Sequence, residues 1–175
     1  MKSYLIHRSD CTERKDCVKN IVNHIPNINI INPVWCPILP ALGCILSHVK
    51  VARLAKDGYY VFEDDAVISD SSFLDIPLND ADVIYFGTNG SAFQTKPIDC
   101  MHHWGTHAMY ISNKARQIFL DNWEAELQHL YPKGFPAIDE IWSVLIRRFG
   151  LEIRIYDMIP QQVGLFSYIS HSIRK

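Results

Sequence analysis

Three adjacent carboxylates, Glu63, Asp64 and Asp65, directly follow an apolar and aromatic run at residues 59–62. β-Branched and aromatic residues favour a buried strand, so this acid triplet is expected at the end of a strand. Like charges this close repel one another, and burying them without a counter-charge is costly. A divalent cation would relieve that cost, and hard oxygen ligands suit Mg²⁺ or Mn²⁺.

The direction of the three side chains follows from the strand that precedes them. Side chains alternate along a strand, so Glu63 and Asp65 are expected to point to one side and Asp64 to the other. Two acids separated by one residue at a strand end are suited to hold a metal ion bound to a diphosphate. The structural alternative is a solvated acidic turn that only ends the strand, because acidic turns are common.

The size and composition of the chain are those of an ordinary globular protein. A length of 175 residues, with 48% hydrophobic and 21% charged residues, predicts a single domain over residues 1–175. The net charge of −2 gives no sign of a nucleic-acid-binding surface, so no nucleic-acid partner is expected.

Cysteine usage and the N-terminus favour an intracellular location. Five cysteines occur without a C-x-x-C pair, which favours reduced thiols over a disulfide framework. The first residues form no apolar signal-peptide core, and no stretch approaches the length of a membrane span. We therefore expect a cytoplasmic protein without a signal peptide or transmembrane segment, of open oligomeric state.

Predicted strands and helices alternate along the chain. Apolar runs predict strands at residues 3–7, 28–31, 59–62, 81–87 and 151–156, and helical spacing predicts helices at 41–56 and 138–149. Asp10, three residues before Glu13, predicts a capped helix after the first strand. Ser112 is expected to cap a further helix that begins after it, and Gly150 to end the helix at 138–149.

This alternation predicts the fold class. An α/β domain of Rossmann type is expected, with a mostly parallel central sheet covered by helices on both faces. Ligands of such sheets bind beyond the carboxyl ends of the strands, and the acid triplet stands at such an end. Its position therefore favours a functional role over a simple turn.

Several short motifs follow one another along the chain: Gly43-Cys44-x-x-Ser47-His48 before the acid triplet, Gly105-Thr106-His107-Ala108-x-Tyr110-x-Ser112, Pro136-x-x-Asp139 and Pro160-Gln161-Gln162…Ser167. In this order they resemble glycosyltransferase family 25, the family of lipooligosaccharide and procollagen galactosyltransferases, which has the GT-A fold. At the start, Ile6-His7 stands where the family has Asn-Leu. The chain is also short for the family, so acceptor specificity does not carry over.

The resemblance implies a minimal GT-A domain that transfers a hexose, galactose or glucose, from a UDP-sugar to a glycan or glycoside hydroxyl. Inversion at the sugar carbon and a role in glycan or lipopolysaccharide biosynthesis are implied by the same resemblance. Mn²⁺ (or Mg²⁺) would neutralise the departing diphosphate. Asp65 would be a direct ligand, Glu63 would reach the metal through water or hold the donor ribose, and His171 is the candidate late ligand. The alternative for His171 is a tail histidine without a role.

The remaining candidates divide between the donor and the acceptor. Donor contacts are expected from Arg8, Arg14, Ser47, His48, Glu63 and Asp64. The alternative interpretation of Arg14 is a charge on the helix surface. The alternative for Ser47 and His48 is a polar pair that packs their helix on the sheet. For the acceptor, Asp139 or Glu140 is the candidate general base. The alternative for Asp139 is an acid favoured by the helix dipole.

Aromatic and histidine residues give weaker signals. Trp35 and Trp104 are candidate platforms for a sugar face, and Trp35 has a core-edge plug as its alternative. A zinc cluster of Cys100, His102, His103 and His107 matches no strong ligand spacing.

Two other functions remain open. A metal-dependent phosphohydrolase or nucleotidyltransferase could use the same acid triplet, although the chain has no glycine-rich phosphate loop. A non-catalytic module that binds a sugar nucleotide or glycan is the third, and it predicts binding without turnover.

Overall fold

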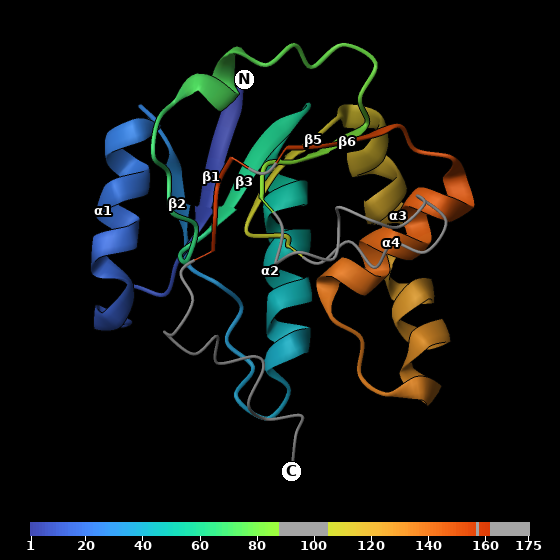
Figure 1. Ribbon diagram of the computed structural model, residues 1–175. Helices are drawn as coiled ribbons and strands as arrows, with labels where there is room; N and C mark the ends of the chain where they lie inside the picture. The colour runs from blue at the N-terminus through green and yellow to red at the C-terminus, as the bar shows by residue number, and fades with distance from the viewer. Residues whose placement is uncertain (88–104, 157, 162–175) are drawn as a thin grey trace.

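A computed structural model describes residues 1–87, 105–156 and 158–161 of the chain (Figure 1). Its strands are β1 (Lys2–Ile6), β2 (Asn29–Ile31), β3 (Tyr59–Glu63), β4 (Val83–Tyr85), β5 (Ala108–Ile111) and β6 (Ile153–Ile155). The helices are α1 (Lys15–His24), α2 (Pro40–Leu54), α3 (Asn113–Leu130) and α4 (Ile138–Phe149). Short 3₁₀ turns are η1 (Thr12–Arg14), η2 (Ser72–Asp75) and η5 (Tyr131–Lys133).

The six strands form one sheet in the order β2-β1-β3-β5-β4-β6. β1 pairs in parallel with β2 and β3, and β4 pairs in parallel with β6. β5 is antiparallel to both β3 and β4. The predicted α/β class with a mostly parallel sheet is therefore confirmed. Because β5 runs against β3, the residues that precede β5 lie beside the end of β3, where the acid triplet stands.

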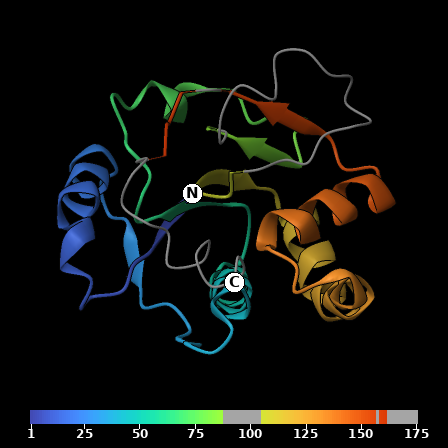
Figure 2. The ribbon, with the colours of Figure 1, turned by 60° about the horizontal axis from the view of Figure 1, so that its bottom comes forward.

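Two apolar cores cover the two faces of the sheet. Tyr59 and Val61 of β3 pack into the core formed with α2, α3 and α4, while Tyr60 and Phe62 pack into the core formed with α1 and η2. Figures 1 and 2 both show α1 on one side of the strands and the other three helices on the opposite side. Burial on both faces explains why this strand reads as a continuous apolar run.

Helix ends agree with the sequence in two places and differ in one. Ser112 caps α3 by accepting a hydrogen bond from the amide of Ala115 (3.1 Å), and Gly150 ends α4 in the left-handed region (φ 57°). The predicted cap at Asp10 is wrong. Asp10 instead accepts a hydrogen bond from Nε of Arg8 (2.6 Å), and η1 precedes α1, which has no side-chain cap.

Two further findings concern the cysteines and the membrane. Cys11, Cys17, Cys36 and Cys44 are free thiols. Within the described ranges, no helix combines the length and the apolar character that crossing a membrane requires.

Candidate active site at the carboxyl ends of the strands

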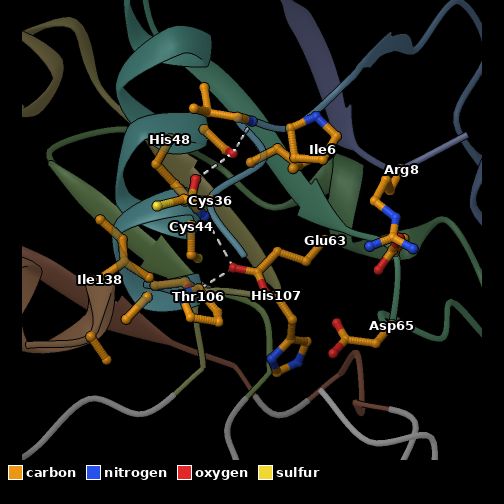
Figure 3. A pocket seen from close by; sticks show the side chains of 18 of the residues that line it. Ile6, Arg8, Cys36, Cys44, His48, Glu63, Asp65, Thr106, His107 and Ile138 are labelled. Atoms are coloured by element: carbon orange, nitrogen blue, oxygen red, sulfur yellow. Dashed lines mark hydrogen bonds and ion pairs between the residues drawn. The ribbon is translucent and has the colours of Figure 1, made fainter. Parts of the chain in front are cut away.

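A cavity of about 340 Å³ lies beyond the carboxyl ends of β1 and β3 (Figure 3). It collects residues from segments far apart in the sequence: the end of β1, the loop before α2, the first turns of α2, the acid triplet, the residues before β5, the start of α4, and Gln161. The sequence-predicted residues that line it are Arg8, Arg14, Ser47, His48, Glu63, Asp64, Asp65 and Asp139.

Glu63, the last residue of β3, is held by two side chains. Its Oε1 accepts hydrogen bonds from Oγ1 of Thr106 (2.7 Å) and from Nε2 of His48 (3.0 Å), as Figure 3 shows. Burial raises the pKa of Glu63, but the hydrogen bonds and charge of His48, followed by Thr106, bring it below its usual value. Glu63 is therefore a carboxylate at neutral pH.

Asp64 also faces the cavity, contrary to the alternation expected from a strand. Its Oδ2 lies 2.9 Å from Nδ1 of His7, and all three acids line the same cavity. The reason is that β3 ends at Glu63, and the next two residues form a turn in which strand alternation no longer applies.

Asp65 is the most buried member of the acid triplet, with 5% of its surface exposed. Its Oδ2 accepts a hydrogen bond from Nε2 of Gln161 (2.6 Å) and lies 3.7 Å from Nη1 of Arg14. Its Oδ1 is buried and has no hydrogen-bond partner in the described part of the chain. Burial, and then the charge of Glu63, raise the pKa of Asp65 to about 6, while Gln161 and Arg14 act in the opposite direction.

The carboxylates of Asp65 and Glu63 fit a divalent cation. The unpartnered Oδ1 of Asp65 and the nearby carboxylate of Glu63 are hard oxygen donors that already repel each other, so a cation would satisfy both. His171 lies outside the described residues.

A second donor set is formed by Cys44, His48 and Glu63, whose donor atoms lie within 4.8 Å of one another. Sulfur and nitrogen donors suit zinc rather than Mn²⁺ or Mg²⁺. Burial, and then the charge of Glu63, raise the pKa of the Cys44 thiol well above its usual value, so the thiol stays protonated and neutral. The residues present therefore fit a hard cation at Asp65 better than a soft one at Cys44.

Asp139 lines the cavity from the first turn of α4. It is far from the acid triplet in the sequence and belongs to a different element. Burial, followed by the charges of Glu63 and Glu140, raises its pKa to about 6. Glu140 has a different place. Its Oε2 accepts a hydrogen bond from the amide of Ala137 (2.9 Å), which caps the helix, and Glu140 is not among the residues that line the cavity.

The two arginines occupy different surroundings. Arg8 stacks on the indole ring of Trp35, with its guanidinium carbon 4.4 Å from the ring centroid. Trp35 is 58% exposed, so the interpretation of Trp35 as a core-edge plug is wrong. Arg14 is only 6% exposed, so it is not a helix surface charge. Both arginines line the cavity and carry the positive charge that an anionic ligand would need.

Ser47 and His48, neighbours on α2, do different things. Oγ of Ser47 donates to the carbonyl of Gly43 (2.6 Å) and accepts from the amide of Val34 (2.8 Å), so it ties the preceding loop to the helix. His48 instead reaches the acid triplet through Glu63.

Residues that the sequence did not single out for the site also contribute to it. His7, Thr106 and Gln161 each contact one acid of the triplet. Thr106 and Gln161 stand in the Gly105-Thr106-His107 and Pro160-Gln161 motifs, and these motifs were the signal for them. His107 lines the cavity and donates from Nε2 to the carbonyl of Ile159 (2.8 Å). Cys100, His102, His103 and Trp104 lie outside the described residues.

Solved structures of transferases resemble this fold. A glycosyltransferase involved in the glycosylation of the major capsid of PBCV-1 matches with a TM-score of 0.60 and 11% identity, over 94% of this chain and 96% of that one. Glycosyltransferase GlyE of Streptococcus pneumoniae matches with 0.55 and 11%, over 89% of this chain and 45% of that one. Galactosyltransferase LgtC, in complex with donor and acceptor sugar analogs, matches with 0.54 and 12%, over 89% and 73%.

A nucleoside-diphosphate-sugar pyrophosphorylase from Vibrio cholerae also matches, with a TM-score of 0.50 and 14% identity over 89% of this chain and 72% of that one. No protein-family model and no curated protein sequence matches the chain. At these identities the similarity concerns the fold, which is that of GT-A-like glycosyl- and nucleotidyltransferases.

Proposed function

We propose that the chain is a metal-dependent glycosyltransferase, similar to family 25, whose single domain spans residues 1–175. It moves galactose or glucose from a UDP-sugar to a glycan or glycoside hydroxyl with inversion. The observation that carries the proposal is the meeting, in one cavity, of Glu63 and Asp65 at the end of β3 with Asp139 on α4. The GT-A-like fold of the similar glycosyltransferases supports it.

The donor half of the cavity would hold the nucleoside diphosphate. Asp65, with Glu63 beside it, would bind Mn²⁺ or Mg²⁺, which supplies charge neutralisation to the departing diphosphate. His48 and Thr106 hold Glu63 in its ionised form. Arg8, stacked on Trp35 at the edge of the cavity, offers a guanidinium to a phosphate group.

The acceptor half would use Asp139 as the general base. A direct displacement requires a group that takes the proton of the acceptor hydroxyl from the side opposite the leaving group. Asp139 meets the chemical requirement because its pKa of about 6 leaves it ionised at neutral pH yet more basic than an ordinary aspartate. It also stands on a different element from the acid triplet, as a base that faces the leaving group should.

A nucleotidyltransferase or phosphohydrolase is the second candidate, favoured by the fold similarity to the sugar pyrophosphorylase. It would use the same acidic residues but release or transfer a nucleotide. The third candidate, a non-catalytic binding module, would bind a donor and form no product. Product analysis separates these functions: a glycosylated acceptor plus UDP, a phosphoryl product (a nucleotide sugar plus pyrophosphate, or released phosphate), or no product.

The first test is a thermal-shift panel of nucleotide sugars with and without Mn²⁺. A ligand that binds only the folded state raises the free energy of unfolding, by about 3 kcal/mol at a ligand concentration of a hundred times Kd, and so raises the melting temperature. We expect one UDP-hexose to stabilise the protein in a metal-dependent manner. Asp65→Asn should abolish the shift, whereas Asp121→Asn, an exposed acid on α3, should leave it unchanged. No shift with any donor or metal would contradict the proposal.

A further inference from the structure

The chain after β6 returns across the strand ends to the acid triplet. Tyr156 and residues 158–161, called here the strap, hydrogen bond along the end of β4. The amide of Tyr156 donates to the carbonyl of Tyr85 (2.8 Å), and those of Met158 and Ile159 donate to the carbonyl of Phe86 (2.8 and 2.7 Å). These bonds fix the strap beside the cavity before it reaches Gln161.

Gly87 and His107 hold the middle of the strap. Nε2 of His107 donates to the carbonyl of Ile159 (2.8 Å). A Cβ atom at Gly87 would lie 1.7 Å from that carbonyl oxygen and 2.4 Å from His107 Nε2, so only glycine permits this approach. The side chain of His107 is 1% exposed, which makes this contact part of the buried structure.

The end of the strap is bound to the turn that carries the acid triplet. The amide of Val67 donates to the carbonyl of Pro160 (2.9 Å), and Ala66 forms an antiparallel bridge with Gln161. The backbone of Gln161 is thereby fixed next to Asp65. Its side chain then needs only one rotamer to reach the Asp65 carboxylate.

The two oxygens of Asp65 have different surroundings. Oδ2 accepts the hydrogen bond from Gln161 at 2.6 Å and lies near Arg14, whereas Oδ1 is buried without a hydrogen-bond partner among the residues described. A glutamine amide is a neutral donor, so it fixes the rotation of the carboxylate without neutralising it. The contact therefore holds the carboxylate with Oδ1 as the oxygen left for another ligand. A buried acceptor of this kind is costly unless something occupies it.

We propose that Gln161 is a positioning residue for Asp65: by engaging Oδ2 it presents Oδ1 as a one-oxygen ligand for Mn²⁺ or Mg²⁺. This inference rests on the proposed function in one respect, that Asp65 binds a hard divalent cation. Partners that orient a ligating carboxylate commonly contribute 10- to 100-fold to metal affinity. The strap, anchored by Gly87 and His107, would thus act on the cation site from 96 residues away in the sequence.

The test measures Mn²⁺ affinity directly, by loss of the electron paramagnetic resonance signal of free Mn²⁺ on titration with protein. We expect Gln161→Met, which fills a similar space without a donor, to weaken binding about tenfold or more. The matched control is Gln117→Met, because Gln117 donates to Asp121 at 2.9 Å on the exposed face of α3 and does not line the cavity. The control should bind Mn²⁺ as the wild type does. Gln161→Asn serves if the Met variant does not fold, and it should also weaken binding because its amide is one methylene too short.

A double-mutant cycle tests whether Gln161 acts through Asp65. Because Asp65→Asn removes metal binding, the cycle uses the free energy of unfolding without metal, and Gln161→Met should lower it less in an Asp65→Ala background than in the wild type. An equal loss in both backgrounds, or wild-type affinity in the Gln161 variants, would overturn the inference while leaving the cation site intact. Failure of the wild-type protein to bind Mn²⁺ would overturn this inference together with the metal part of the proposed function.

Discussion

Nε2 of His48 lies 3.0 Å from Oε1 of Glu63 and joins α2 to the end of β3. The contact links a helix on one face of the sheet to the first acid of the triplet. His48 is 1% exposed, and its Nδ1 has no hydrogen-bond partner within the described ranges. Its main contribution is therefore made through Nε2, which keeps Glu63 ionised despite its burial.

Replacement of His48 by leucine should destabilise the protein by about 1–3 kcal/mol at pH 7. Glu63 would stay buried but lose one of its two hydrogen-bond donors and keep only Thr106. The sign of the pH dependence follows from the pKa of Glu63, which lies below its usual value in the wild type. The stability gained from that carboxylate is present above its unfolded pKa and is lost as the pH falls through its folded pKa. Urea unfolding should therefore show a difference between variant and wild type that is largest at pH 7 and narrows toward pH 4.

The exposed His129 on α3 supplies the control for this experiment. His129→Leu should leave the free energy of unfolding within about 0.5 kcal/mol of the wild type at both pH values. An equal loss in the two variants would mean that the contact with Glu63 contributes nothing.

Much of the fold was predictable because local patterns determine local structure. The bounds of α4 were predicted to the residue, since apolar spacing and Gly150 mark both the buried face and the end of the helix. The antiparallel direction of β5 was not, because alternation of strands and helices predicts parallel neighbours and does not reveal the strand that departs from this rule. That direction matters for the site, since it brings Thr106 beside Glu63.

Local motifs identified many residues that line the cavity, from Arg8 to Asp139, but not the contacts between them. The acid triplet stands out because three charges follow an apolar run. The contact of Gln161 with Asp65 joins residues 96 positions apart, and no local pattern encodes it. The alternation rule also failed at Asp64, because it holds only while the strand continues.

Asp65→Asn should stabilise the metal-free protein at neutral pH while it removes metal binding. The pKa of Asp65 is about 6 in the folded protein against an ordinary value of 3.8, so its ionisation opposes folding as the pH rises between these values. The asparagine variant escapes that cost and should be more stable than the wild type by up to about 3 kcal/mol at pH 7. The gain is reduced because Arg14 loses its counter-charge. Urea unfolding at pH 4 and pH 7 without metal checks this, and equal differences at the two pH values would contradict it.

Mn²⁺ should stabilise the wild-type protein more at pH 7 than at pH 5. Binding requires Asp65 without its proton, and with a pKa of about 6 most molecules carry that proton at pH 5. At one fixed Mn²⁺ concentration, the increase in melting temperature should therefore be smaller at pH 5, where the apparent affinity is about tenfold weaker, and should approach its full size by pH 7. A shift independent of pH over this range would indicate that the cation binds elsewhere.

Asp139 and Glu140 are adjacent, yet opposite effects are expected on replacing them. Asp139→Asn should lower kcat by about 10²- to 10⁴-fold, because it removes the proposed base, while the thermal shift caused by donor and metal is retained. Glu140→Gln should change kcat by no more than a few-fold, because Glu140 caps α4 at Ala137 and does not line the cavity. Wild-type kcat/KM should rise through about pH 6 as Asp139 loses its proton. A large loss of kcat in Glu140→Gln, with full activity in Asp139→Asn, would transfer the role of base to Glu140, and indifference to both changes would favour a binding module or a reaction that needs no base on α4.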